Sequence, residues 1–476
     1  MNSRLLPRLP AFGHWLLLTL VTALFSQAAP APKWNLLFVT ADDMNADSVG
    51  WMGCKLGTSP NLDAFAATAH QFRQNHVTVP ICQPGRSAFM TGRVPHRNGA
   101  LGFQPITPGT PTLTSVLRAA GYFTAVIDKH PHMKPDAEFN WDLKLSGSGK
   151  NPPLFGEHVA QSIKAAADAG KPFFLNANIT DPHRPFVSSA QGAAQKANPK
   201  KAAKRDADGE VKSFKPEEVT VPAFLEDLPE VRREVAQYYS SVRRFDASFG
   251  EAMAALKAAG READTVVIFI SDHGMSFPFS KATVYRNGTW SPVLVRWPGM
   301  GAPQRREELT SSVDIVPTLL EVLKQPPLAG VDGRSWLPLL RGEVQPDRDF
   351  VITHVNTVSS GKSFAQRCVR TREFSYQFHA WPNGTAHFRV EAMAGITFAA
   401  LAKAGETDAR IKSRVEQLTV GTPEQFFDLR TDPDERVNRI SEAKHAAEIA
   451  RLKQRLLAHM EKTADPQLES FRKLVK

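Results

Sequence analysis

Continuous apolar runs that end in polar or charged residues recur along the first two thirds of the chain. Three of them are "WNLLFVTADD" at 34–43, "KPFFLNANITDPHRPF" at 171–186 and "DTVVIFISDHG" at 264–274. Runs of strand length with no polar face are typical of strands that are covered on both sides. The pattern therefore predicts buried, mainly parallel strands, each followed by a polar loop.

Segments with helical periodicity separate these runs. A helix is predicted to start near Thr112 and stop at Gly121, with a strand at 123–127 after it; further helices are predicted over 231–260 and 311–323. Strands that alternate with helices predict an α/β fold, a large mixed and mostly parallel sheet flanked by helices on both faces. In such sheets ligands bind at the carboxyl ends of the strands.

The character of the sequence changes after Gly342. Short strand-like pieces follow at 349–355, 366–379 and 424–438, and an amphipathic helix is expected from Glu442 to Glu461. We therefore expect two domains, a catalytic domain at residues 33–342 and a smaller C-terminal α+β domain at residues 343–476 with an antiparallel sheet and a terminal helix.

The first 29 residues have the pattern of a secretory signal peptide. Arg4 and Arg8 precede the apolar run "WLLLTLVTALF", and small residues follow in "SQAAPAP". The run is too short to span a membrane comfortably, although an uncleaved anchor is the alternative. We expect residues 1–29 to be removed and the protein to be exported, either to a periplasm or out of the cell, with no membrane span.

Removal of Arg4 and Arg8 lowers the formal net charge from +10 to +8. A basic exported protein suits anionic partners, but charge alone does not identify them, and we expect no nucleic-acid partner. The basic run at 195–205 is typical of a solvated loop, and the alternative is that it borders a cleft for a polyanion. Three cysteines leave at least one thiol unpaired, and a disulfide between Cys54 and Cys368 stays open as an alternative.

Four side chains that follow predicted strands have the chemistry of a metal site. Asp42 and Asp43 end one strand, and Asp272 and His273 follow another. Oxygen-rich sites of this kind take calcium or magnesium, and we expect calcium, because it tolerates irregular geometry better. Taken singly, each pair could be a capped loop or a turn; their joint position after buried strands favours the metal site.

Cys82 stands at the predicted start of a helix, in "CQPGR". Pro84 suits the first helical turn, and Arg86 lies one turn after Cys82, so that the two share a helix face. A thiolate is a soft ligand and calcium is a hard ion. This conflict disappears if Cys82 is converted to a residue that carries oxygen. The alternative is a small buried hydrophobic side chain.

The Cys-x-Pro-x-Arg motif, followed by a helix and "TGRVPHRNG", resembles the signature of type I sulfatases of the alkaline phosphatase superfamily. The resemblance extends from "NLLFVTADD" to "EQFFDLRTDPDERVN" and departs at Gly85, where serine or another small residue is more usual. It implies an alkaline-phosphatase-like fold and a calcium ion. It also implies that a formylglycine-generating enzyme oxidises Cys82 to Cα-formylglycine, whose hydrate attacks the substrate sulfur.

The resemblance also implies roles for individual residues. The calcium ligands would be Asp42, Asp43, Cys82, Asp272 and His273, the last where many members have asparagine. Arg86 would hold the formylglycine hydrate, Lys129 and Lys281 would bind sulfate, and His183 would protonate the leaving group. His132 matches a further active-site histidine, with His130 as the competing candidate, since Asp128 stands where glycine is usual.

The segments "SDHGMSFPFSKATVYRNGTWSPVLVRWPG" and "TDPHRPF" are similar to the heparan N-sulfatase (sulfamidase) branch. On that resemblance the substrate is an N-sulfated glucosamine of heparan-type glycans, with O-sulfated sugars and aryl sulfates as alternatives. Two other functions stay open: a phosphonate or phosphate ester hydrolase of the same superfamily, and an inactive protein that binds anionic glycans. The oligomeric state is left open.

Overall fold

A large sheet of eight strands forms the centre of the computed structural model, which describes residues 33–192, 212–346 and 348–475. The strand order is β4-β3-β5-β1-β6-β7-β2-β8, and β7 alone runs antiparallel to its neighbours. The strands are β1 (Asn35–Asp42), β2 (His70–His76), β3 (Phe123–Ile127), β4 (Leu143–Leu145), β5 (Phe173–Pro182), β6 (Thr265–Ser271), β7 (Val293–Arg296) and β8 (Arg305–Ser311). The predicted mixed, mostly parallel sheet is confirmed.

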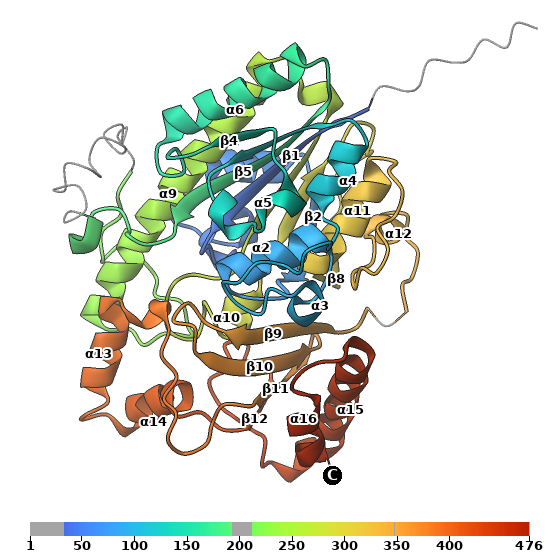
Figure 1. Ribbon diagram of the computed structural model, residues 1–476. Helices are drawn as coiled ribbons and strands as arrows, with labels where there is room; N and C mark the ends of the chain where they lie inside the picture. Colours follow the sequence, from blue (N-terminus) through green and yellow to red (C-terminus); the bar gives the residue numbers. More distant parts are fainter. Residues whose placement is uncertain (1–32, 193–211, 347, 476) are drawn as a thin grey trace, which may run out of the picture. The chain divides into compact units, whose positions relative to one another are not determined.

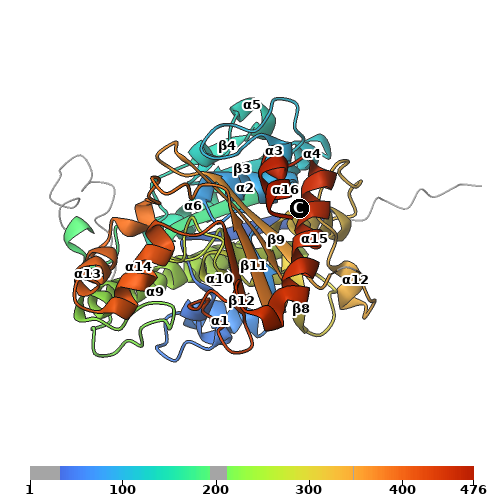
Figure 2. The same ribbon diagram turned by 90° about the horizontal axis from the view of Figure 1, so that it is seen from below.

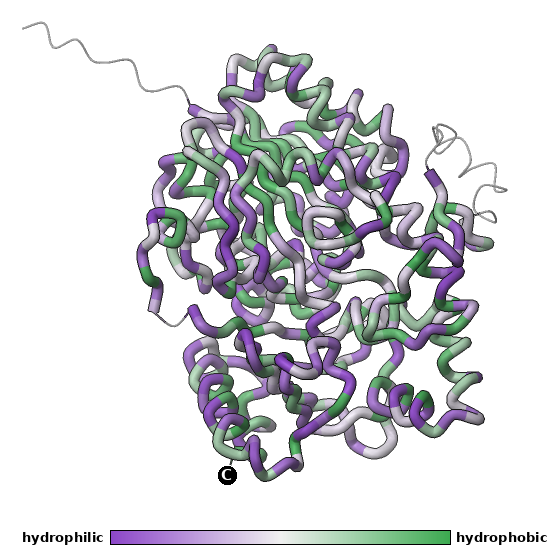
Figure 3. The backbone as a smooth tube through the Cα atoms, turned by 180° about the vertical axis from the view of Figure 1, so that it is seen from behind, coloured by the Kyte–Doolittle hydropathy of each residue, from purple (hydrophilic) through white to green (hydrophobic). Residues whose placement is uncertain are grey.

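Helices cover both faces of this sheet, as expected (Figure 1). Alternate residues of β1 point to opposite sides, because the side chains of a strand alternate. Leu37 and Val39 join a core with α6 (Pro152–Asp168) and α9 (Pro229–Ala258). Leu36 and Phe38 join a second core with helices α2 (Cys82–Thr91), α4 (Leu113–Ala119) and α11 (Ile315–Val322). Figure 3 shows the hydrophobic strands of the sheet inside more polar surroundings.

A second, four-stranded sheet follows in the C-terminal part (Figures 1 and 2). Its order is β12-β11-β10-β9, and all its pairs are antiparallel. The strands are β9 (Val351–Thr357), β10 (Ser363–Arg370), β11 (Phe374–His379) and β12 (Glu424–Asp428). Helix α15 (Ala446–Thr463), the predicted terminal helix, packs on this sheet together with α16 (Leu468–Val475), which was not predicted.

Seven further α-helices lie within the described residues. They are α1 (Pro60–Ala66), α3 (Pro95–Asn98), α5 (Asp136–Phe139), α10 (Arg286–Thr289), α12 (Leu337–Leu340), α13 (Ile396–Ala404) and α14 (Ala409–Thr419). Strands β2 and β8 escaped prediction, because their sequences HQFRQNH and RREELTS contain few apolar residues. These two strands lie at one end of the sheet, where a strand needs fewer apolar side chains than at the centre.

Two sequence predictions, the signal peptide at 1–29 and the basic loop at 195–205, lie outside the described residues. No helix within the described ranges has the length and apolar character needed to cross a membrane. Cys54, Cys82 and Cys368 are all unpaired, so the alternative of a Cys54–Cys368 disulfide is not realised. Cys368 is buried in β10, where its sulfur lies 3.4 Å from the Ser375 hydroxyl.

Candidate active site

Helix α2 presents Cys82 as its first residue, as predicted from the sequence. The helix is buried along its whole length and ends where Gly92 takes a left-handed conformation, with φ of 65°. Gly85 is also required by packing, because a Cβ atom there would lie 2.7 Å from the carbonyl oxygen of Val79. Gly92 therefore ends the helix, and Gly85 allows its first turn to approach the backbone of Val79.

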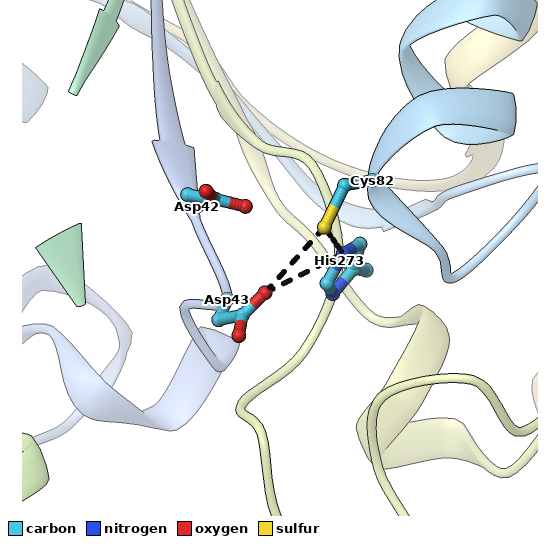
Figure 4. Close-up of side chains that lie close together, drawn as sticks. All are labelled: Asp42, Asp43, Cys82 and His273. Carbon is cyan, nitrogen blue, oxygen red and sulfur yellow. Dashed lines mark hydrogen bonds and ion pairs between the residues drawn. The ribbon is translucent and has the colours of Figure 1, made fainter. Parts of the chain in front are cut away.

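The carboxylates predicted as metal ligands lie beside Cys82, because β1 and β6 are neighbouring parallel strands. The Cys82 sulfur lies 4.0 Å from Oδ1 of Asp43 and 3.2 Å from Nε2 of His273 (Figure 4). One ligand atom from each of Asp42, Asp43, Cys82 and His273 lies within 4.8 Å of the others. Asp272 joins this group through its Oδ1, 3.6 Å from Nε2 of His273.

The orientation of His273 suits a metal ligand. Its Nδ1 donates a hydrogen bond of 3.0 Å to the carbonyl oxygen of Gly274. This bond fixes the proton on Nδ1 and leaves the lone pair of Nε2 facing Cys82 and Asp43, the latter at 3.5 Å. The imidazole is therefore held as a donor toward the centre of the cluster.

Arg86 is fully buried beneath this cluster. It donates hydrogen bonds of 2.9 Å to Asp272, 3.0 Å to Thr40 and 2.6 Å to Asn178. Thr40 and Asn178 were missed by the sequence analysis. The available signal was a polar side chain inside an otherwise apolar strand, in β1 and β5 respectively.

Two lysines bring positive charge to the carboxylates. Lys129 forms an ion pair with Asp42, and Lys281 lies 2.9 Å from Asp43. Lys129 itself has a left-handed backbone, with φ of 51°, and Lys281 stands between two residues with such backbone, Phe279 (φ 64°) and Ala282 (φ 66°). Backbone in this region is costly for residues other than glycine and is concentrated at functional sites.

His183 follows β5 and faces the same carboxylates. Its Nε2 lies 4.0 Å from Asp43 and 3.3 Å from Glu391, while its Nδ1 donates a 2.6 Å hydrogen bond to the carbonyl oxygen of Arg184. Glu391 also lies 3.3 Å from Lys281. Glu391 was missed, because it comes from the C-terminal part of the chain and no motif surrounds it.

The two competing histidines differ in their surroundings. Burial lowers the pKa of His132 to about 3, with further lowering by the nearby charges of Lys129 and Arg86. Burial also lowers the pKa of His130, but the charges that act on it, Lys144 above all, lie away from the cluster. His132 therefore shares the electrostatic environment of the site, and His130 does not.

Burial and charge have opposite effects on the acids of the cluster. Burial would raise the pKa of Asp42, but the cations around it, Lys129 foremost, hold it well below its usual range. Burial raises the pKa of Cys82 well above its usual range, and the carboxylates add to this in spite of Lys281. An unmodified Cys82 is thus a neutral thiol, which is a poor nucleophile and a poor metal ligand.

The site opens to solvent on one side. The side chains of Asp42, Arg86 and His273 are completely buried, whereas those of Lys129, His183 and Glu391 are 12%, 22% and 36% exposed. A substrate therefore meets Lys129, His183 and Glu391 first, with the carboxylate cluster beneath them.

The family of the chain follows from comparison with known proteins. The family model for sulfatases matches residues 34–325, so the chain belongs to the sulfatase family, a family of hydrolytic enzymes. Human N-sulphoglucosamine sulphohydrolase is 30% identical over 338 residues, which cover 65% of this chain. The match covers 66% of the human protein, just under two thirds of its length. Human arylsulfatase A is 27% identical over 472 residues, covering 88% of this chain and 86% of the relative.

Solved structures share the fold over nearly the whole chain. One is a protein that was solved in complex with its substrate, D-glucosamine-2-N,6-O-disulfate. It has a TM-score of 0.67 and 16% identity to this chain, and the match covers 91% of this chain and 99% of the other. Another is a phosphonate monoester hydrolase from Silicibacter pomeroyi, with a TM-score of 0.64 and 19% identity over 92% of this chain and 97% of the other. At these identities the structures support the fold alone.

Proposed function

We propose that the protein hydrolyses sulfate esters or sulfamates of amino sugars, with N-sulfated glucosamine from heparan-type glycans as its substrate. The observation that carries the proposal is the position of Cys82. It begins α2, within 4.0 Å of Asp43 and 3.2 Å of His273, in a cluster that also holds three buried or partly buried cations. The signal-peptide pattern of residues 1–29 supports the further proposal that the protein is exported, either to a periplasm or out of the cell.

The donor set fits a calcium ion better than magnesium. Both side-chain oxygens of Asp42 are buried and, apart from the ion pair of Asp42 with Lys129, have no hydrogen-bond partner among the described residues. Lone pairs therefore remain that a ligand could use. We propose Asp42, Asp43, Asp272 and His273 as ligands, together with the oxygen that replaces the sulfur of Cys82. Bound calcium would supply positive charge that stabilises the sulfuryl oxygens as the S–O or S–N bond breaks.

Conversion of Cys82 to formylglycine by a formylglycine-generating enzyme removes two mismatches at once. A neutral thiol cannot attack, and sulfur is a poor partner for calcium. The hydrated formylglycine would supply a hydroxyl nucleophile and a second hydroxyl through which sulfate is released. Arg86, held by Asp272, Thr40 and Asn178, positions the side chain at residue 82 from below.

The chain's own cations orient and neutralise the substrate. Lys129 and Lys281 are placed to bind sulfuryl oxygens, and the carboxylates around them keep both lysines charged. Burial alone would lower the pKa of Lys281, but Asp43 and the other anions raise this pKa well above its usual value. Four carboxylates and three cations leave the cluster slightly negative. A divalent cation reverses that sign, which favours an anionic substrate.

His183 is positioned to protonate the leaving oxygen or nitrogen. Its Nδ1 donates to the Arg184 carbonyl, which directs Nε2 toward the site. Glu391, 3.3 Å from Nε2, stabilises the protonated imidazole, so we add it to the proposed positioning residues. His132 lies near Lys129 at the same site and is neutral at pH 7, because burial lowers its pKa to about 3.

The substrate proposal has two supports. Human N-sulphoglucosamine sulphohydrolase is the 30% identical relative, and a similar structure holds a glucosamine that carries N- and O-sulfate. The second candidate function is phosphonate ester hydrolysis, which the shared fold with the phosphonate monoester hydrolase favours. A phosphonate monoester is also an anion with a tetrahedral centre and would meet the same cations.

Sulfate release from purified protein, coexpressed with a formylglycine-generating enzyme, tests the proposal. The substrates would be glucosamine N-sulfate, N-acetylglucosamine 6-sulfate and a phenyl phosphonate monoester, with and without calcium, and Cys82→Ala as the control. We expect the largest kcat/KM for glucosamine N-sulfate, and a peptide containing residue 82 that is about 18 mass units lighter than the thiol form. A larger kcat/KM for the phosphonate would favour the second candidate. An unmodified thiol in the native host with no turnover would refute both.

A further inference from the structure

A second cluster of metal-binding side chains lies apart from the candidate active site. One ligand atom from each of His96, His354 and Asp465 lies within 4.8 Å of the others, and Nε2 of His354 lies 3.1 Å from Nε2 of His459. We propose that these four residues form a site for Zn²⁺ or another divalent transition-metal ion that prefers imidazole. The proposal does not depend on the proposed hydrolase function.

Three ring nitrogens of this cluster lack a hydrogen-bond partner among the described residues. Neither ring nitrogen of His96 makes a hydrogen bond among the described residues, nor does Nδ1 of His354. The side chain of His96 is 4% exposed and His354 is fully buried, so bulk water does not satisfy them. Buried nitrogens without partners are costly, and a ligand that uses their lone pairs removes that cost.

The geometry of the rings suits a shared ion. His354 lies between its two neighbours: its ring centroid is 5.5 Å from that of His96 and 5.2 Å from that of His459. Tetrahedral zinc takes four ligands from imidazole, thiolate and carboxylate groups, and three imidazoles with one carboxylate make such a set.

Asp465 can join the set while keeping its present partner. Arg367 donates to both of its oxygens, at 2.6 and 2.7 Å, and the backbone N–H of Gln467 donates to Oδ1. Oδ2, which lies 3.8 Å from Nδ1 of His96, keeps a second lone pair for an ion. The arginine cancels the charge of the carboxylate, so the site has no excess negative charge to attract a hard ion such as calcium. Neutral imidazoles select zinc, copper or nickel instead.

The site would join distant segments. His96 lies in α3, shortly after α2, whereas His354 lies in β9 and His459 in α15. A metal ion bound here ties the segment after α2 to the four-stranded sheet and its terminal helix. His459 is only half-buried and provides the side from which an ion enters. The expected role is therefore structural.

Metal binding to the full-length protein tests this proposal. In a Cys82→Ala background, with excess CaCl2 present to occupy the proposed metal position of the active site, CoCl2 should give the visible absorption of tetrahedral cobalt with one further ion bound, and ZnCl2 should displace it. ZnCl2 alone should raise the unfolding midpoint by about 3 °C or more. His387→Gln, at an exposed histidine, is the matched control and should behave like the parent.

His96→Asn combined with His459→Gln should abolish the cobalt spectrum and the thermal shift. Cobalt binding that is unchanged in this double variant, or no binding by the parent, would overturn the proposal. If the double variant does not fold, anomalous scattering at the zinc edge from crystals of the parent decides. A peak between His96, His354 and His459 supports the site, and its absence after a zinc soak refutes it.

Discussion

Two of the regions in which the protein buries charge differ in the partners of those charges. Beneath the four-stranded sheet, Arg370 donates to Glu435 at 2.7 Å and to the carbonyl oxygen of Val284, while Glu435 also accepts from Gln377 and from the backbone of Arg286. At the carboxyl edge of the large sheet, Asp42 forms an ion pair with Lys129, but neither its oxygens nor Nε of Arg86 has a hydrogen bond among the described residues.

This difference separates a structural use of charge from a chemical one. A buried pair whose hydrogen-bonding atoms are satisfied holds two elements together, and it has little capacity left for a ligand. Unsatisfied oxygens beside a pair of lysines are costly in the folded protein, and a bound cation and anion would remove that cost. Four substitutions test whether the two regions separate in this way.

Cys82→Ala should have the largest effect and should act on activity alone. Loss of the proposed nucleophile should lower kcat/KM for glucosamine N-sulfate by at least about ten-thousandfold. The unfolding free energy should change by only about 1 kcal/mol, since one sulfur atom is removed. Sulfate release and urea unfolding measure the two effects.

Cys54→Ala is the matched control, because Cys54 is half-buried and lies away from the cluster. It should keep full activity. Appreciable turnover by Cys82→Ala would mean that another residue attacks the substrate. The proposal that residue 82 supplies the nucleophile would then be wrong.

Glu435→Gln should have the opposite signature. It leaves the guanidinium of Arg370 buried without an anion, and breaking a buried pair in this way costs about 3–5 kcal/mol of unfolding free energy. The kcat of the folded fraction should be unchanged. Urea unfolding measures the loss, and Glu373→Gln, at an exposed pair, should shift the free energy by no more than about 0.5 kcal/mol.

A second substitution distinguishes the pair from its surroundings. Arg370→Met added to Glu435→Gln should recover part of the lost stability, because the stranded charge is removed. If the double variant is no more stable than Glu435→Gln, the cost comes from the other contacts of Glu435 and not from the buried arginine.

The sequence predicts the residues of a region well where those residues directly follow recognisable strands or belong to a motif. Asp42, Asp43, Asp272 and His273 follow buried strands, and parallel neighbours bring such positions to one edge. The predicted residues Cys82, Arg86, Lys129, His183 and Lys281 lie in or around the same cluster. Glu391 was not predictable, because its contacts with His183 and Lys281 arise only when the C-terminal part folds onto the large sheet.

The C-terminal sheet shows the same limit. Its strands were predicted from short strand-like segments, but the pairing of Arg370 with Glu435 joins residues that are 65 positions apart. Nothing local marks either residue, since arginine and glutamate are usually exposed. The polar strands β2 and β8 were missed for a related reason: their place in the sheet is set by the partners beside them.

Lys281→Met should reduce kcat by about a hundred- to a thousand-fold, because it removes one of the cations proposed to bind the sulfuryl oxygens. Methionine keeps the apolar part of the side chain in its buried position. Steady-state kinetics with glucosamine N-sulfate measure the effect. Lys412→Met, at an exposed lysine of α14, is the matched control and should leave kcat unchanged. An unchanged kcat in Lys281→Met would show that this lysine does not assist the reaction.

The smallest effect concerns pH and the C-terminal sheet. His379, in β11, is buried, and burial lowers its pKa to about 3, whereas a histidine in the unfolded chain titrates near about 6.5. Between these values the unfolded state takes up a proton that the folded state does not. Stability is therefore complete above about pH 6.5 and falls on acidification, by up to about 1.4 kcal/mol per pH unit for this residue.

His379→Gln should remove that contribution, because glutamine does not titrate and its amide can still donate to the Gln377 side chain, which lies 3.3 Å from Nε2 of His379. Urea unfolding at intervals between pH 7 and about pH 4.5 should give a shallower loss of stability for the variant than for the parent. Parallel curves would show that His379 is protonated in the folded protein. The buried carboxylates whose pKa is lowered, such as Asp42, lose their contribution only at a lower pH. Acid should therefore weaken the four-stranded sheet before it neutralises Asp42 at the edge of the large sheet, and this order separates the two regions by a measurement that needs no substrate.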